Sequence, residues 1–214
     1  MSNHSLIDIL NVIFNKVKPK QFLTIGDHGR YVLPIPEGIE AIGVDPWPAR
    51  KDKELAPNQS IFPVTSDYFF HSVYMTRGIN PDIVLITKIQ RVEHVLRDII
   101  FSEKLCKDNA VIMITGTCPA DVRDTERSAQ LLYPTQVGDV YKLIPIIKKL
   151  RPKIKISTIT DIPDGVTILE NLDRTDSVMQ MRMVQSLVEV FGIKFEDRDL
   201  STHVTFDDYV KQIS

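Results

Sequence analysis

The sequence predicts an α/β domain with a mostly parallel central sheet and helices on both faces, and three observations support this prediction. Short, continuous apolar runs such as Ile83–Ile86 are typical of parallel strands that are covered on both faces. Segments with helical spacing alternate with these runs between residues 20 and 150, which favours strand–helix–strand units. After Arg151 the pattern changes to two strands joined by a turn, which predicts a C-terminal antiparallel hairpin.

The first half of the chain begins with a predicted helix over Ser5–Val17. Its apolar residues share one face, Ser5 is the expected N-cap, and Pro19 is expected to end it. The strands that follow are expected over Phe22–Ile25, Glu40–Val44, Ile61–Val64, Asp82–Ile86 and Ala110–Ile114. A helix over residues 89–105 is expected to connect the last two strands.

The second half contains the predicted hairpin, with strands over Lys153–Ile159 and Val166–Leu169. A further helix is expected over Ser177–Phe191. It packs either on the sheet or on another subunit, and the sequence does not decide whether the protein is a homo-oligomer. We expect a single domain with an N-terminal helix in residues 1–19, a sheet core in residues 20–170 and a helical extension in residues 171–214.

Composition narrows the class of protein. The chain has 214 residues, of which 43% are hydrophobic and 25% charged, as expected for one globular domain with a full core. The net charge of −2 speaks against a nucleic-acid partner, and no apolar run approaches the roughly 20 residues of a membrane span, so no membrane partner is expected. Two cysteines, Cys106 and Cys118, and a start unlike a signal peptide favour the cytoplasm.

The turn after the first strand is the main candidate site. Ligands of open α/β sheets bind beyond the carboxyl ends of the strands, where Gly26 and Gly29 allow the backbone to come close to a ligand. Asp45 ends the second strand, and its carboxylate is suited to accept hydrogen bonds from ribose hydroxyls; the alternative is a cap on the turn before Pro46. Only a short segment separates the turn from Pro34, which disfavours a dinucleotide cofactor.

A second part of the site is expected after the third strand. Ser66 and Asp67 lie at the position that faces an adenine in this topology. The same two residues are suited to cap a helix, and the sequence leaves both roles open.

These stretches resemble a bacterial family of small class I S-adenosylmethionine-dependent methyltransferase domains found among surface-sugar and secondary-metabolite genes. The resemblance covers residues 20–170 and rests on the order and spacing of several stretches, which are Leu23–Gly29, Ile42–Pro46, Val64–Phe70, Asp82–Ile86, Glu93–Asp98 and Gly138–Lys142. It implies a Rossmann-like fold and S-adenosylmethionine as the cofactor. It implies cofactor binding at Gly26, Gly29 and Asp45, with the adenine near Ser66 and Asp67. We expect Asp27 and Thr87 to belong to the same cofactor site.

The chain departs from this family at two strand ends. The fourth strand of the family usually ends in Asp-Gly, with a His three residues after that Asp, where this chain has Thr87, Lys88 and Gln90. After the fifth strand the family often has a His-Asp pair, where this chain has Thr115 and Gly116. Because carboxylates at these positions are the natural ligands of a divalent metal, we expect metal-independent chemistry and no metal site.

The remaining candidates for catalysis are few. His94 is a candidate base, although a surface histidine is the simpler interpretation, and Lys142 is either a site residue or a solvated lysine. Glu93 and Arg97 have the spacing of an ion pair on a helix surface. His28 contacts the cofactor carboxylate or is a solvated loop residue, and the sequence does not decide which.

Two functions of different classes therefore stay open. The first is a methyltransferase that acts on a small-molecule or sugar-like acceptor, supported by Gly26, Gly29 and Asp45. The second is a degenerate, non-catalytic domain that binds a nucleoside ligand or a protein partner, supported by the substitutions at residues 87, 90, 115 and 116.

Overall fold

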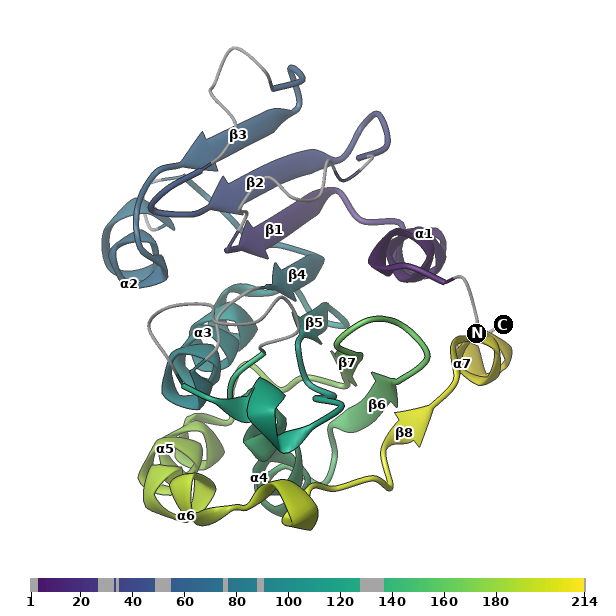
Figure 1. Cartoon of the computed structure of the whole chain (residues 1–214). Helices are drawn as coiled ribbons and strands as arrows, with labels where there is room; N and C mark the ends of the chain where they lie inside the picture. Colours follow the sequence, from purple (N-terminus) through teal and green to yellow (C-terminus); the bar gives the residue numbers. More distant parts are fainter. Residues whose placement is uncertain are drawn as a thin grey trace.

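A computed structural model describes residues 4–26, 33, 35–48, 55–74, 77–87, 91–127 and 137–213. Its centre is an eight-stranded sheet with the order β3-β2-β1-β4-β5-β7-β6-β8 (Figure 1). The bounds of the strands are β1 Gln21–Ile25, β2 Glu40–Val44, β3 Gln59–Phe62, β4 Ile83–Ile86, β5 Val111–Thr115, β6 Lys155–Ile159, β7 Val166–Glu170 and β8 His203–Val204.

Strand direction confirms the predicted mixed sheet. Strands β3, β2, β1, β4 and β5 are all parallel, and β7 is antiparallel to both β5 and β6. The order reverses between β1 and β4, so the chain builds the sheet outward from its middle in both directions. In open α/β sheets this switch point is where ligands bind.

Helices cover both faces of the sheet, as the sequence predicts. The helices and helical turns are α1 Leu6–Val17, α2 Ser66–Tyr68, a π-helical turn Phe69–Val73, α3 Val92–Leu105, α4 Leu143–Leu150, α5 Ser177–Gln185, α6 Leu187–Gly192 and α7 Phe206–Ile213, with 3-10 turns at Val122–Thr125, Val140–Lys142 and Phe195–Asp197. Helices α1 and α7 pack together on one face, and α2 to α6 lie on the other (Figure 1).

Helix α1 forms where its pattern predicts. Ser5 is its N-cap and makes a reciprocal capping box with Asp8, which satisfies donors of the first turn. Its apolar stripe is buried against the sheet. The helix ends at Lys18, which adopts the left-handed conformation (φ 49°) just before Pro19.

The C-terminal region differs from the prediction in two ways. The helix expected over Ser177–Phe191 is interrupted at Ser186 and consists of α5 and α6. The extension expected to be helical also supplies β8, a two-residue strand that pairs with β6. So short a strand carries too little hydrophobic periodicity to be recognised from the sequence.

Buried hydroxyls link this last strand to the sheet. Thr158 of β6 is hydrogen-bonded to Thr202 at 3.1 Å and to Thr167 of β7 at 2.9 Å, and Thr167 donates to Thr117 at 2.9 Å. Each of these threonines is at most 8% exposed, so the chain of hydroxyls satisfies polar groups that would otherwise be buried alone.

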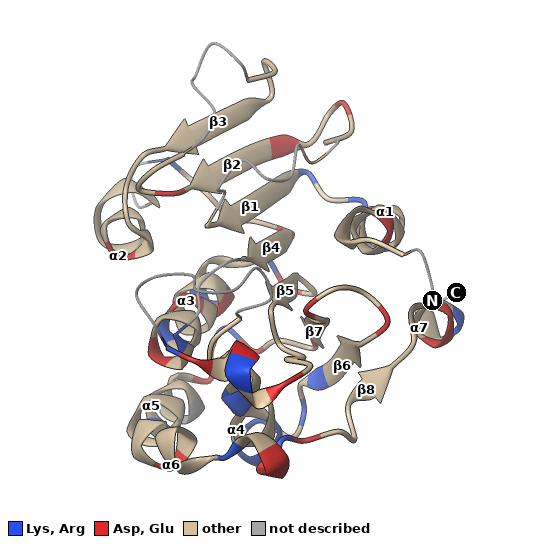
Figure 2. Cartoon of the chain, in the orientation of Figure 1, with Lys and Arg blue, Asp and Glu red and all other residues tan. Residues whose placement is uncertain are grey.

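Charges of both signs occur across the view of Figure 2, with both signs on α3 and basic residues alone on α4. Within the described ranges, none of the helices combines the length and apolarity needed to cross a membrane.

Candidate functional site

The ends of β1, β2 and β4 meet at the switch point of the sheet. The Gly26 N–H donates to the Val44 carbonyl at 2.9 Å, and the Thr87 N–H donates to the Ile25 carbonyl at 2.9 Å. The structure therefore brings Gly26, Asp45 and Thr87 together, one at the carboxyl end of each strand.

Gly26 has a structural reason for being glycine. Its φ is +87°, and a Cβ at this position would lie 2.1 Å from the Thr87 carbonyl oxygen. No Cβ fits between the backbones of Gly26 and Thr87. Contact with the neighbouring strand end therefore already requires glycine at residue 26, independently of the ligand contact that the sequence predicted.

Asp45 is fully buried at the end of β2. Its Oδ1 accepts a hydrogen bond from the Trp47 N–H at 2.7 Å, which is the turn-capping alternative. A carboxylate offers about four acceptor positions, so capping Trp47 and accepting from a ribose are not mutually exclusive.

Ser66 and Asp67 follow β3, but the N-cap of α2 is Thr65, whose hydroxyl accepts from the Tyr68 N–H. Arg97 of α3 binds both predicted residues, with Nη1 2.5 Å from the Asp67 Oδ2 and Nη2 3.1 Å from the Ser66 Oγ. The polar groups of Ser66 and Asp67 are therefore bound by Arg97, for which the sequence predicted Glu93 as the partner.

The ion pair predicted between Glu93 and Arg97 is wrong. Arg97 turns toward Ser66 and Asp67, and Glu93 pairs with Arg127. Spacing along one helix identified two residues able to pair, but tertiary neighbours offered each of them a different partner.

Asp98 is a polar residue of this region that sequence reasoning missed. It is fully buried on α3, with its Oδ1 3.4 Å from Arg97. Burial raises the pKa of Asp98 to about 6, and the nearby Arg97 guanidinium opposes that rise. The available signal was a charged residue between the apolar positions Leu96 and Ile99 of one helix.

Lys142 lies in a cluster beside the amino end of α3. Asp139 is buried, accepts from the Val92 N–H at 2.9 Å and lies 3.3 Å from Arg127. Burial raises the pKa of Asp139. Lys142 lies 4.0 Å from Asp139 and donates to the Phe191 carbonyl at 3.2 Å. It is therefore not a solvated lysine, because it connects this cluster to α6.

Asp139 is not directly followed by an α-helix. The chain instead enters the 3-10 turn Val140–Lys142, and α4 begins at Leu143. The carboxylate of Asp139 is thereby left to cap α3 rather than its own helix.

Neither strand end that departs from the family presents a carboxylate. Thr87 is buried, and Gly116 has a φ of +75°, at which an added Cβ would lie 3.2 Å from the Val137 Cβ.

His94 is exposed on the first turn of α3, and partial burial together with Arg97 lowers its pKa. Burial raises the pKa of Cys118, which disfavours a thiolate nucleophile.

Several predicted residues lie outside the described residues, namely Asp27, His28, Gly29, Lys88 and Gln90. Among the residues that are described, no group of three or more His, Cys, Asp or Glu side chains is placed to hold a metal ion.

The strand order and the antiparallel β7 define a Rossmann-like sheet of the methyltransferase type. No family model and no curated protein matches the chain. Solved structures do match: an O-methyltransferase from Bacillus cereus in complex with S-adenosylhomocysteine is 12% identical with a TM-score of 0.54, over 77% of this chain and 80% of that one.

Two other solved structures match to the same extent. The O-methyltransferase TomG from Streptomyces achromogenes, involved in tomaymycin synthesis and in complex with S-adenosylmethionine, is 12% identical with a TM-score of 0.57, over 77% of this chain and 78% of that one. Cofactor-bound Rv0187 from MTB is 12% identical with a TM-score of 0.55 over the same shares. At this identity the likeness establishes the fold.

Proposed function

We propose that the chain is an S-adenosylmethionine-dependent methyltransferase that acts on a small-molecule or sugar-like acceptor. The observation that carries the proposal is the meeting of Gly26, Asp45 and Thr87 at the switch point of a methyltransferase-type sheet. Similar solved structures include one in complex with S-adenosylhomocysteine and one with S-adenosylmethionine.

The residues at the strand ends fit the chemistry of the cofactor. Asp45 would accept hydrogen bonds from the ribose hydroxyls, and Ser66 and Asp67 would lie toward the adenine, with Arg97 holding their side chains in place. Asp45 is fully buried in this structure.

S-adenosylmethionine supplies a methyl group that its sulfonium already activates, so the protein has mainly to align the acceptor and exclude water. We propose that the transfer is metal-independent. Thr87 and Gly116 occupy the two strand ends where the carboxylate ligands of a metal would be needed, and Gly116 has a backbone conformation that favours glycine.

One observation favours the non-catalytic alternative. Of the two candidate catalytic residues, Lys142 is engaged by Asp139 and by the Phe191 carbonyl, and His94 is an exposed residue of α3. A domain that binds a nucleoside ligand without turnover would need only the strand ends.

Calorimetry with S-adenosylmethionine and S-adenosylhomocysteine tests the proposal. We expect binding by the native chain and a loss of at least tenfold in affinity for Asp45→Asn, which keeps the side-chain volume. Asp82→Asn is the matched control, because Asp82 lies at the amino ends of the central strands, opposite the candidate site. There it accepts hydrogen bonds from the Lys20 and Gln21 N–H groups. Failure of both ligands to bind at millimolar concentration would remove the cofactor.

Turnover is tested separately with radiolabelled methyl donor and panels of hydroxylated metabolites and glycans. Methylated product supports the methyltransferase. Cofactor binding without product across the panels favours the non-catalytic domain.

A further inference from the structure

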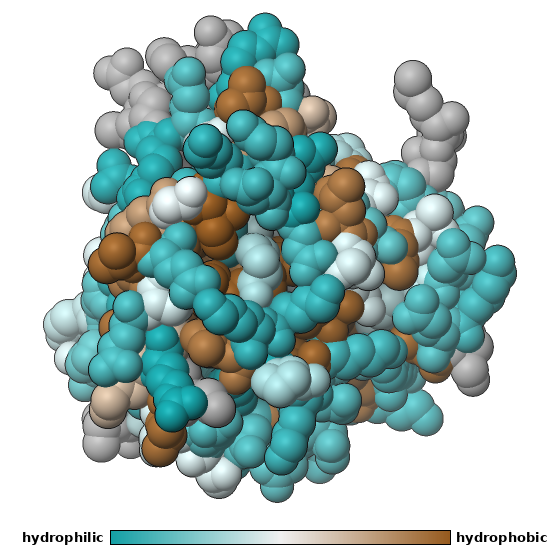
Figure 3. Space-filling model, turned by 90° about the horizontal axis from the view of Figure 1, so that it is seen from below, coloured by the Kyte–Doolittle hydropathy of each residue, from teal (hydrophilic) through white to brown (hydrophobic). Residues whose placement is uncertain are grey.

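Helix α6 is weakly attached to the body of the molecule. It consists of Leu187–Gly192, and a break at Ser186 separates it from α5. Of its own side chains only that of Val190 is fully buried, whereas Val188 is 84% and Phe191 43% exposed. The helix lies at the lower end of the molecule in Figure 1, and the view of that end in Figure 3 shows hydrophobic side chains dispersed among hydrophilic ones. A segment with so few buried contacts opens at a low cost in free energy.

The break at Ser186 is suited to act as a hinge. The Ser186 N–H donates to the Arg182 carbonyl at 2.9 Å at the end of α5, and the Val190 N–H donates to the Ser186 carbonyl at 2.9 Å at the start of α6. Within the described part of the chain, the N–H groups of residues 187–189 make no backbone hydrogen bond to α5. Rotation at this one residue therefore moves α6 without unwinding α5.

Two cations hold the end of α6 at Phe191. The Lys142 Nζ donates to the Phe191 carbonyl at 3.2 Å, and the Arg127 guanidinium lies over the Phe191 ring, with its Cζ 5.1 Å from the ring centroid. Carbonyls in the last turn of a helix lack partners within the helix and form the negative end of its dipole, so an ammonium group is favourable there. The guanidinium adds a cation–π attraction to the ring.

One buried carboxylate holds both cations. The Asp139 Oδ2 lies 3.3 Å from the Arg127 Nη1 and 4.0 Å from the Lys142 Nζ, and the Asp139 side chain is only 2% exposed. The Asp139 Oδ1 accepts from the Val92 N–H at 2.9 Å, which fixes the carboxylate to the first turn of α3. Arg127 also pairs with Glu93 on the same turn. Both cations are therefore positioned by groups outside α6.

These charged residues lie near the carboxyl ends of β4 and β5. Val137, two residues before Asp139, packs against Gly116 at the end of β5, where an added Cβ would lie 3.2 Å from the Val137 Cβ. Val92 begins α3 five residues after Thr87, which follows β4. The end of α6 is therefore fastened to the side of the candidate site that β4 and β5 form.

We propose that α6 is a flap hinged at Ser186, and that Asp139, Arg127 and Lys142 form the latch that holds it closed. Opening of the flap releases Phe191 and frees the two cations at the ends of β4 and β5. Flaps of this kind admit a substrate and then exclude water from the reaction. A role in admitting the methyl acceptor rests on the proposed function, whereas the latch itself does not.

Amide hydrogen exchange, measured by mass spectrometry on the chain without cofactor, detects opening of residues 187–193. In the native chain this segment should exchange more slowly than an unstructured peptide but faster than β4 and β5, as local opening requires. Lys142→Met removes the ammonium group and keeps the apolar stem, so exchange of the segment should become at least about tenfold faster. Asp139→Asn should act similarly, because it removes the charge and keeps an oxygen that accepts from the Val92 N–H.

Lys149→Met is the matched control, because Lys149 pairs with Glu189 of α6 outside the latch and both side chains are more than half exposed. Its effect on exchange of the segment should stay below about threefold. The double variant of Lys142→Met and Asp139→Asn should exchange little faster than either single variant, since both remove the same latch. Arg127→Gln takes the place of Asp139→Asn if that variant does not fold.

Equal effects of Lys142→Met and Lys149→Met would overturn the proposal. Exchange of residues 187–193 only together with β4 and β5 would also overturn it, because α6 would then not open by itself. Effects of the two latch variants that multiply in the double variant would exclude a single shared latch. None of these measurements needs S-adenosylmethionine, so their outcome is separate from the success or failure of the proposed methyl transfer.

Discussion

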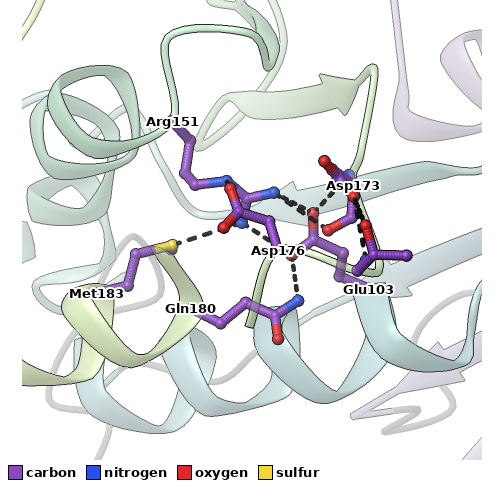
Figure 4. Close-up of polar contacts among 7 residues, drawn as sticks. Glu103, Arg151, Asp173, Asp176, Gln180 and Met183 are labelled. Carbon is purple, nitrogen blue, oxygen red and sulfur yellow. Dashed lines mark hydrogen bonds and ion pairs between the residues drawn. The ribbon is translucent and has the colours of Figure 1, made fainter. Parts of the chain in front are cut away.

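Arg151 and Glu103 form a buried ion pair with two contacts, in which Nη1 lies 2.9 Å from Oε2 and Nη2 lies 2.6 Å from Oε1 (Figure 4). Arg151 is 4% exposed and Glu103 1%. The Glu103 carboxylate also accepts from the Gln180 side chain and from the Asp173 N–H, both at 2.9 Å. One carboxylate on α3 thus holds the end of α4 and the start of the C-terminal extension.

Loss of one partner of this pair should strongly destabilise the protein. Arg151→Met leaves the Glu103 carboxylate buried without its cation, which costs about 3–5 kcal/mol in buried pairs. Urea unfolding at neutral pH measures the loss of unfolding free energy. The matched control is Lys149→Met, which removes an exposed ion pair with Glu189 and should cost less than about 1 kcal/mol. Equal losses for the two variants would contradict this view of the pair.

Gly26 and Gly38 provide a second comparison. Both have a positive φ, +87° and +86°, but a Cβ on Gly38 would meet nothing within 4 Å, whereas one on Gly26 would clash with the Thr87 carbonyl. Gly38→Ala should cost roughly 1 kcal/mol from backbone strain alone. Gly26→Ala should cost at least roughly 3 kcal/mol, because strand ends must separate. Thermal or urea unfolding measures both, and similar values would show that the contact with Thr87 is easily relieved.

Asp98 should make stability depend on pH. Because burial raises its pKa from an ordinary 3.8 to about 6, the folded protein holds this proton more tightly than the unfolded chain between those values. The contribution of Asp98 to stability is therefore greatest below pH 4, falls as pH rises to 6 and stays low above it. A shift of this size corresponds to on the order of 3 kcal/mol.

The Asp98→Asn variant tests this directly. It should be more stable than the native chain at pH 7.5 and should lose that advantage near pH 4.5, measured by urea unfolding at the two values. The Asp67→Asn variant serves as the control, because it removes a half-exposed carboxylate next to the same Arg97 and should not reproduce the effect. A pH profile that Asp98→Asn leaves unchanged would assign the proton to another group.

His94 should prove dispensable for folding. It is exposed, so His94→Gln is expected to change the unfolding free energy by less than about 0.5 kcal/mol and to leave cofactor affinity unchanged. Once an acceptor is known, the same variant tests whether His94 acts as the catalytic base. We expect its rate to stay within about threefold of native, and a hundredfold loss would instead establish His94 as a base.

Much of the fold follows from local patterns in the sequence. The buried strands around Ile83–Ile86 and Val111–Thr115 are recognised because apolar runs bounded by turns have few alternatives, and α1 because its stripe and its cap agree. The antiparallel hairpin of β6 and β7 was predictable for the same reason. The sequence did not predict β8, which has only two residues, or the interruption of the C-terminal helix at Ser186.

The candidate site was predictable only in part. The sequence identifies Gly26 and Asp45 as strand-end residues, because glycine and a carboxylate after apolar runs stand out locally. Tertiary structure alone decided that Gly26 faces Thr87, that Arg97 binds Asp67 and that Lys142 contacts α6. The physical reason is distance along the chain: the partner of a charge is chosen by packing between elements, and a single sequence records only neighbours within a turn or two of one element.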